Sequence, residues 1–314
     1  MNENLAMKGL DLCEQYFRAV GLPMLRRDFG KDIDRIAAGL VGDGSECFGF
    51  DDEISRDHDW GPGFCLWLES EDYERIGPQL QAALDALPPR FLGYGPRRSS
   101  RWGTGRIGVF ETSRFYERFT GMKELPRDVN DWLWLPENSL AACTNGKVFW
   151  DPLGEFTRRR NALLAFYPED VRLKKIASRC MTIGQAGQYN VPRCLRRGEW
   201  FAAQYAETKF CADVISLVFL LNRRYTPFYK WMHRAVKDLP ILGLWAHGRI
   251  GDLIALTNLA DKVDLIEAMC VGLIEELKRQ GLTDHPGSFM ADHGPEIVRR
   301  IGDERLRGLD VWIG

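Results

Sequence analysis

The placement of strand-like segments along the chain constrains its fold more than any other feature of the sequence. Short apolar runs bounded by glycine, proline or charged residues occur at residues 64–68, 106–112 and 147–151, and such runs predict strands. From about residue 155 onward strand signals disappear, and apolar residues recur at helical spacing. We therefore expect an α+β protein in which residues 1–154 form a domain with a small mixed sheet flanked by helices, and residues 155–314 form an all-α helical bundle.

Helical periodicity marks the other elements of both parts. In the first part it predicts helices over 5–20, 24–40, 72–87 and 136–143. In the second part it predicts a long amphipathic helix over 193–221 among shorter ones. The chain then breaks at residues 222–227, and Pro227 is expected to open the next helix, since proline is tolerated in a first helical turn.

Composition excludes several classes of protein. The chain has 314 residues, an apolar fraction of 45% and a formal charge of −2, which is typical of a soluble globular protein and argues against long nucleic acid as an obligate partner. No secretory signal and no membrane-spanning run is present, and the eight cysteines have neither zinc-ligand nor disulfide-framework spacing. We expect a cytoplasmic protein with reduced, buried thiols.

The stretch from Gly42 to Trp60 carries the strongest functional signal. Gly44 lets the backbone approach a phosphate closely, and Ser45 adds a hydroxyl donor. In an extended segment, Asp57 and Asp59 would present both carboxylates to the same face. Because Mg²⁺ binds hard oxygen ligands and is often held between carboxylates and substrate phosphates, this pattern predicts a nucleotide site with Mg²⁺ or Mn²⁺ at the two aspartates.

At these residues the chain resembles the polymerase-β-like nucleotidyltransferase superfamily, in which Gly-Ser is followed by Asp-x-Asp on a strand. The wider string from Gly44 to Gly61 is similar to an uncharacterised bacterial branch, a domain of unknown function. The resemblance implies a plan like that of the aminoglycoside nucleotidyltransferases, with a catalytic sheet domain at 1–154 and a helical bundle after it. One departure is the insertion of Trp60-Gly61-Pro62-Gly63 after Asp59, and the proline predicts a bend or an edge position for the strand that carries the aspartates.

The same resemblance implies a third carboxylate on a neighbouring strand, where it would ligate metal or take the proton of the attacking hydroxyl. Glu111 is the chosen residue, with Glu117 and Asp131 as rivals. Four other acidic residues also compete for metal. For these residues a solvent-facing hairpin tip is the favoured interpretation: Glu46, Asp51, Asp52 and Glu53.

Two basic stretches are candidates for contacting the substrate. Residues 96–105 include Arg97, Arg98 and Arg101, and a solvated connection is favoured over a phosphate clamp. In the helical part, Lys230 and Lys209 are the candidate phosphate contacts, and Tyr225 or Trp231 is available to stack on a base.

The predicted activity is Mg-dependent transfer of a nucleoside monophosphate, with ATP as the first choice among NTPs, to a hydroxyl of an acceptor. A small-molecule acceptor is favoured, and modification of a protein or a tRNA end remains open. The alternatives are a drug-modifying resistance enzyme and a non-catalytic nucleotide- or partner-binding module on the same fold. The sequence does not determine the acceptor or the oligomeric state.

Overall fold

The computed structural model describes residues 7–98 and 105–314, which divide into two compact units. The first unit contains the described residues up to Leu125 together with Ser139–Ala165, and the second contains Pro126–Asn138 and Phe166–Gly314. This division differs from the predicted boundary at 154/155, because the chain passes between the units three times. Two elements account for the difference: α5 (Val129–Trp134) packs on α8 (Glu169–Ile183) in the second unit, whereas α7 (Glu155–Leu164) places Phe156 against the sheet of the first.

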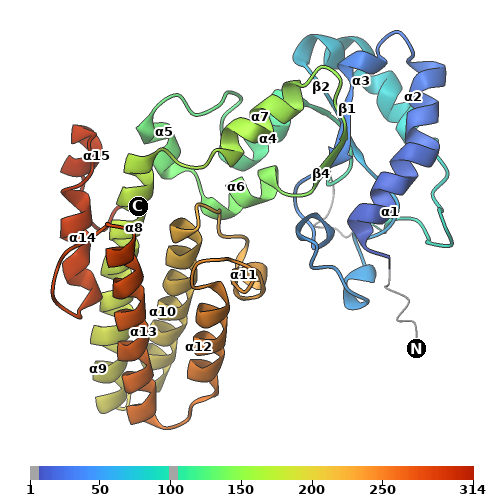
Figure 1. The fold of residues 1–314 in the computed structure, drawn as a ribbon. Helices are drawn as coiled ribbons and strands as arrows, with labels where there is room; N and C mark the ends of the chain where they lie inside the picture. Colours follow the sequence, from blue (N-terminus) through green and yellow to red (C-terminus); the bar gives the residue numbers. More distant parts are fainter. Residues whose placement is uncertain (1–6, 99–104) are drawn as a thin grey trace. The chain divides into compact units, whose positions relative to one another are not determined.

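The first unit is built on a four-stranded sheet with strand order β3-β2-β1-β4 (Figure 1). Its strands are β1 (Ala37–Leu40), β2 (Cys65–Leu68), β3 (Gly108–Glu111) and β4 (Lys147–Trp150). β1 pairs antiparallel with both β2 and β4, and β2 pairs parallel with β3. The sheet is therefore mixed, and the predicted α+β class is confirmed.

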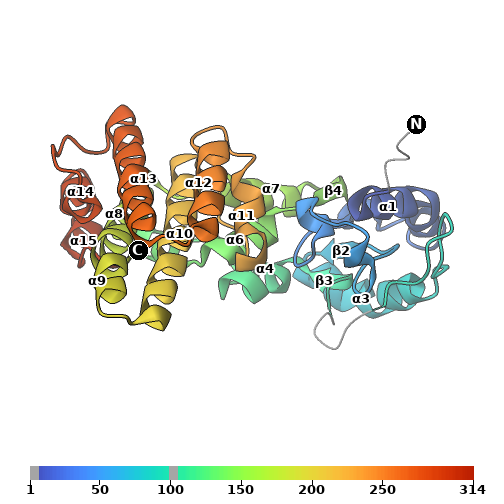
Figure 2. The same ribbon diagram turned by 90° about the horizontal axis from the view of Figure 1, so that it is seen from below.

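Helices cover both faces of this sheet. They are α1 (Gly9–Tyr16), which continues through a π-helical turn (Phe17–Gly21) into α2 (Leu22–Asp28), and α3 (Ser70–Asp85), α4 (Thr112–Thr120), α6 (Glu137–Thr144) and α7. Figure 2 shows α1 and α3 on one side of the sheet and α4 on the other, and the Tyr16 hydroxyl of α1 donates to the carbonyl of Pro88, just after α3. Because successive side chains of a strand point to opposite faces, Trp67 packs on Phe115 and Phe156 while Phe64, on the opposite face, packs on Phe17.

One predicted element of the first part is wrong. The expected helix over 24–40 ends at Asp28, and Ala37–Leu40 is instead the central strand β1. The sequence Ala-Ala-Gly-Leu has no β-branched residue and therefore little intrinsic strand preference. All four residues are buried between β2 and β4, so tertiary packing overrides local propensity here.

The described residues of the second unit form helices joined by loops, without a strand. Besides α5 and α8 it contains a π-helical segment (Gly184–Asn190), α9 (Val191–Arg196), α10 (Trp200–Leu221), α11 (Tyr229–Val236), α12 (Gly243–Ala255), α13 (Leu259–Arg279), α14 (Met290–Val298) and α15 (Glu304–Gly308). The predicted helix over 193–221 is divided in two because Gly198 takes a φ of +72° between α9 and α10. Gly187 allows the close approach of α10, since a Cβ there would lie 2.3 Å from the Phe210 ring.

Two sequence expectations about the whole chain can be compared with the structure. All eight cysteines lie in the described residues as free thiols, and seven of them are buried. Among the described residues, no helix combines the length and the apolarity needed to cross a membrane.

Candidate functional site

The turn that follows β1 has the backbone expected of a close-approach loop. Gly42 and Gly44 have φ angles of +125° and +139°, which side-chain-bearing residues rarely adopt. The Asn145 side chain holds Gly42 on both sides: its Oδ1 accepts from the Gly42 N–H at 2.9 Å and its Nδ2 donates to the Gly42 carbonyl at 2.8 Å. Ser45 is partly buried, and it begins a 3₁₀ turn (Glu46–Phe48) in which its carbonyl accepts from the N–H of Phe48.

The sheet topology brings Gly42–Ser45 and Asp57–Asp59 to the same end of the paired strands β1 and β2, which we call the motif edge. Gly39 of β1 pairs with Cys65 of β2 in antiparallel register, so the end of β1 lies beside the start of β2. The Gly42–Ser45 turn leaves from that edge, and residues 57–63 approach the same edge before entering β2. The start of β3 also lies there, because β3 runs parallel to β2.

The two aspartates are not on a strand, which corrects the expected extended segment. Asp57 ends a 3₁₀ turn (Ile54–Arg56) with helical dihedrals, and Asp59 has a φ of +53°. The Asp57 side chain is 64% exposed and lies 2.7 Å from the imidazole of His58. Asp59 is buried, and its carboxylate lies 3.5 Å from the guanidinium of Arg106. The proline predicted only a bend or an edge position, whereas Asp57 and Asp59 have no strand geometry at all.

Arg97 connects the two parts of the motif. Its guanidinium lies 2.7 Å from the Glu46 carboxylate and also donates to the carbonyl oxygens of Asp59 and Gly61, at 2.6 and 3.0 Å. Burial disfavours the charged guanidinium, yet Cys13 and Glu46 act in the opposite direction and the net pKa of Arg97 is raised. Arg97 is therefore a buried, charged connection between the loop after β1 and the segment before β2.

This arrangement corrects two expectations about charged residues. Arg97 was expected in a solvated connection, and Glu46 and Asp51 at a solvent-facing tip, but all three are buried. Asp51 accepts from the Gly9 N–H at 2.7 Å and the Trp60 indole at 3.0 Å. Asp52 and Glu53 are exposed, as expected. Arg101 lies outside the described residues.

Glu111 lies at the other end of the sheet. It pairs with Leu68, the last residue of β2, whereas Asp59 precedes the first. Its carboxylate accepts from Ser70 and Ser113 at 2.7 and 2.6 Å and pairs with Arg114. Burial raises the pKa of Glu111, but these hydrogen bonds and nearby cations outweigh burial and lower it overall. The structure does not bring Glu111 to the two aspartates.

The remaining predicted residues belong to the second unit. Lys209 on α10 pairs with Asp213 one turn later, at 2.9 Å. The Tyr225 ring is buried against Phe166 and Tyr167 and cannot stack on a base, which corrects that expectation. Lys230 on α11 is exposed, and its ammonium lies 4.9 Å from the Trp231 ring centroid.

The donor set at the motif edge limits what metal it can hold. Within residues 7–98 and 105–314, no three His, Cys, Asp or Glu residues gather into a metal-binding group. Asp57 and Asp59 supply two carboxylates from one short segment, and Mg²⁺ commonly combines one or two carboxylates with substrate phosphates. In the structure the Asp57 carboxylate lies beside His58 and the Asp59 carboxylate beside Arg106.

Comparison with known proteins gives two matches. Residues 132–232 match the model of a domain of unknown function, DUF4037. Among solved structures, a nucleotidyltransferase-like protein from Exiguobacterium sibiricum matches with 12% identity and a TM-score of 0.36, covering 92% of this chain and 81% of that one. No curated protein matches the chain. The DUF4037 match includes Lys209, Tyr225 and Lys230 and excludes the motif edge.

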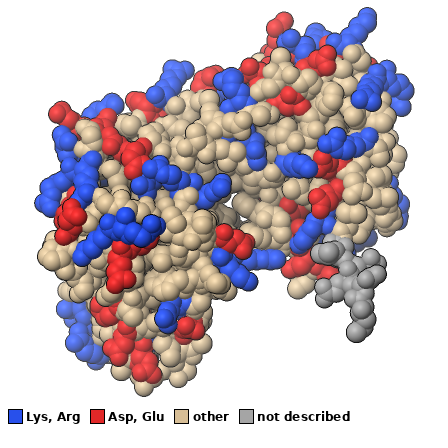
Figure 3. Space-filling model, viewed as in Figure 1, with Lys and Arg blue, Asp and Glu red and all other residues tan. Residues whose placement is uncertain are grey.

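Sequence reasoning missed the roles of Arg97 and Arg106. They lie on either side of residues 98–105, and their pairing with Glu46 and Asp59 has no signal in the local sequence. Charges on the surface are otherwise mixed: on the face drawn in Figure 3, Lys and Arg are interspersed with Asp and Glu, in agreement with the net charge of −2.

Proposed function

We propose that the motif edge of the first unit, formed by Gly42–Ser45 and Asp57–Asp59, is a nucleotide site and that the protein transfers a nucleoside monophosphate from an NTP, with ATP as the first choice, to an acceptor hydroxyl. One observation carries this proposal: the antiparallel pairing of β1 with β2 brings the glycine turn and the aspartates, separated in sequence, to the same edge of the sheet.

Each group at this edge has a role in the proposal. The backbone of Gly44 and the hydroxyl of Ser45 bind the terminal phosphates. Asp57 and Asp59 hold Mg²⁺, which neutralises the charge of the phosphates when it is bound. Arg97 neutralises Glu46, whose carboxylate lies against Gly44 and would otherwise repel an incoming phosphate.

A second candidate is a nucleotide- or partner-binding module without turnover. The position of Glu111 at the far end of β2 and β3 favours it, because the carboxylate expected to accept the proton of an acceptor hydroxyl is then away from Asp57 and Asp59. A nucleotide-binding module would share the nucleotide site with the transferase and differ from it in catalysis alone. A small molecule is the first choice of acceptor, and a protein or a tRNA end remains an alternative.

Calorimetric titration with non-hydrolysable NTP analogues, with and without Mg²⁺, tests the nucleotide site. We expect Mg-dependent binding by the unaltered protein, weakened at least tenfold in Asp57→Asn/Asp59→Asn. Glu53→Gln removes one exposed acidic residue from the same segment and serves as the control for the loss of a nearby negative charge. Failure of every NTP to bind under either condition would sink the transferase and the nucleotide-binding module, and would leave the partner-binding module.

Release of pyrophosphate separates the enzyme from the module. Protein that binds NTP is incubated with labelled ATP and candidate acceptors, and transfer of label identifies the acceptor class. Mg-dependent binding without release of pyrophosphate in the presence of small-molecule, protein or tRNA acceptors would favour the binding module.

A further inference from the structure

A cavity of about 570 Å³ lies entirely within the second unit. Its walls come from the residues between α5 and α6, from α8 and α10, and from the start of α11. Every lining residue except Gly314 falls within 132–232, the segment that matches DUF4037. The volume is that of a site for a small organic molecule. It is separate from the motif edge, which belongs to the first unit.

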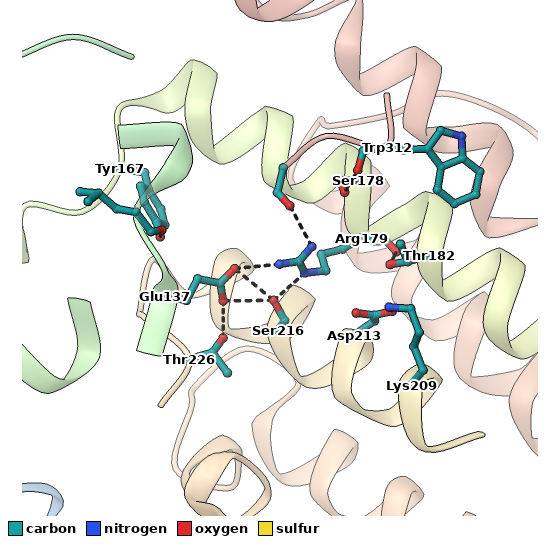
Figure 4. A network of polar contacts seen from close by, with 12 residues as sticks. Glu137, Tyr167, Ser178, Arg179, Thr182, Lys209, Asp213, Ser216, Thr226 and Trp312 are labelled. Carbon is teal, nitrogen blue, oxygen red and sulfur yellow. Dashed lines mark hydrogen bonds and ion pairs between the residues drawn. The ribbon is translucent and has the colours of Figure 1, made fainter. Parts of the chain in front are cut away.

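The polar groups on one side of this cavity satisfy one another. The Glu137 carboxylate accepts from Thr226 at 2.6 Å, from Ser216 at 3.1 Å and from Arg179 at 3.1 Å. Figure 4 shows these four side chains joined in one network, with Lys209 directed at Asp213 beside it. Each of the two acidic residues thus has a cationic partner, so the network forms a rigid and nearly neutral wall.

Lys175 of α8 is the exception among the lining residues. It is 5% exposed, and within the described part of the chain no hydrogen bond or ion pair engages its ammonium, whose neighbour is the Tyr167 ring at 5.0 Å. Burial lowers the pKa of Lys175 to about 8, opposed by the charge of Glu137 and assisted by that of Arg179. A buried cation without an acceptor is costly, and an anionic group entering the cavity would supply the acceptor.

Aromatic side chains at the same cavity are open to solvent. Trp134 is 64% exposed, Tyr229 75% and Phe228 47%, and the rings of Phe228 and Tyr229 lie 4.2 Å apart. Exposed aromatic residues that line a concave site are typical of ligand pockets, because a bound apolar group covers them. The cavity therefore combines one cation that lacks an acceptor with an aromatic wall.

We infer that this cavity is a binding site for a small organic anion, with a carboxylate or phosphate group on Lys175 and an aromatic body against Trp134, Phe228 and Tyr229. The inference does not depend on the proposed nucleotidyl transfer, because no residue of the motif edge takes part in it. A bare inorganic anion would use Lys175 but leave the aromatic wall exposed, so an aromatic anion fits the site better.

The test uses the full chain and three probes of one shape: 1-naphthoate, 1-naphthyl phosphate and the neutral 1-naphthalenemethanol. Calorimetric titration at pH 7 is expected to give at least tenfold tighter binding for one of the anions than for the alcohol, and the stronger of the two identifies the head group. Equal binding of all three, or no binding at millimolar concentration, would overturn the inference.

Substitutions then locate the head group. Lys175→Met is expected to reduce anion binding to the level of the alcohol. Lys262→Met removes a cation that is paired with Glu207, and neither residue lines the cavity, so it is expected to leave anion binding unchanged. Phe228→Ala is expected to weaken anion and alcohol alike. An anion preference that survives in Lys175→Met would contradict the assignment of the head group to Lys175. If a variant fails to fold, the comparison of the three probes on the unaltered protein still tests the inference.

Discussion

The guanidinium of Arg97 and the carboxylate of Glu46 form a buried ion pair, with their nearest atoms 2.7 Å apart and side-chain exposures of 4% and 3%. The pair joins two segments that are 51 residues apart in sequence. Since Arg97 also donates to the backbone carbonyls of Asp59 and Gly61, it links the turn after β1 to the segment before β2.

Removing one member of this pair should destabilise the first unit strongly. Arg97→Met leaves the Glu46 carboxylate buried without its cation, and breaking a buried pair typically costs about 3–5 kcal/mol. Urea unfolding measures the loss. Arg27→Met provides the control, because the Arg27–Asp28 pair is exposed and its removal is expected to have no measurable effect. A midpoint for Arg97→Met equal to that of the unaltered protein would contradict the structural role.

Substitutions at Asp57 and Asp59 should differ in their effects on nucleotide binding and on stability. Asp57 is exposed, so Asp57→Asn is expected to leave the melting temperature unchanged while abolishing the effect of Mg²⁺ on nucleotide binding. Asp59 is buried with a positive φ, and Asp59→Ala should destabilise the protein because alanine pays about 1–2 kcal/mol in that conformation and the contact with Arg106 is lost. Melting curves and calorimetry on both variants distinguish these effects. Equal destabilisation by the two substitutions would show that this description of the segment is wrong.

The buried ammonium of Lys175 should lower the free energy of unfolding of the protein. Its pKa of about 8 in the folded protein lies below the ordinary 10.5, so the unfolded chain binds more protons between pH 8 and 10.5 and stability rises with pH in that window. Below pH 8 both states are protonated and the whole penalty is present, about 3 kcal/mol at 1.36 kcal/mol per pKa unit.

The pH dependence of this penalty predicts how replacing Lys175 changes stability. Lys175→Met is expected to be more stable than the unaltered protein at pH 7, with a gain that shrinks as the pH rises toward 10.5. Denaturant unfolding at pH 7, 8.5 and 10 measures this trend, and Lys209→Met is the paired-lysine control. A destabilised variant would mean that the ammonium has a structural partner.

Replacing either of two glycines in the second unit by alanine should change stability in opposite directions. Gly187→Ala places a Cβ 2.3 Å from the Phe210 ring, and overpacking of this kind costs about 1–3 kcal/mol. Gly248 lies in α12 with no heavy atom within 4 Å of its Cβ position, so Gly248→Ala should stabilise the protein by about 0.4–1 kcal/mol. Thermal unfolding of both variants compares them directly. Opposite shifts would support the packing of α10 on the π-helical segment, and similar shifts would contradict it.

The sequence predicted the fold where the signal was local. The apolar runs that became β2, β3 and β4 were visible because each is bounded by glycine, proline or charged residues, but β1 was hidden because Ala37–Leu40 owes its conformation to its two neighbouring strands. The pairing of β1 with β2 explains why Gly44 and Asp59 share an edge. The position of Glu111 could not be predicted, since it depends on β3 running parallel to β2, and neither the burial of Glu46 nor its partner Arg97 has a signal in local periodicity.

The division of the chain at Leu125, Asn138 and Ala165 also has a consequence for synthesis. Residues 126–138 leave the ribosome before any part of α8, on which α5 packs. They include Leu133–Asn138, which line the cavity of the second unit. This wall of the cavity is therefore synthesised first. It has no packing partner in the second unit until the rest of the first unit and then α8 have been translated.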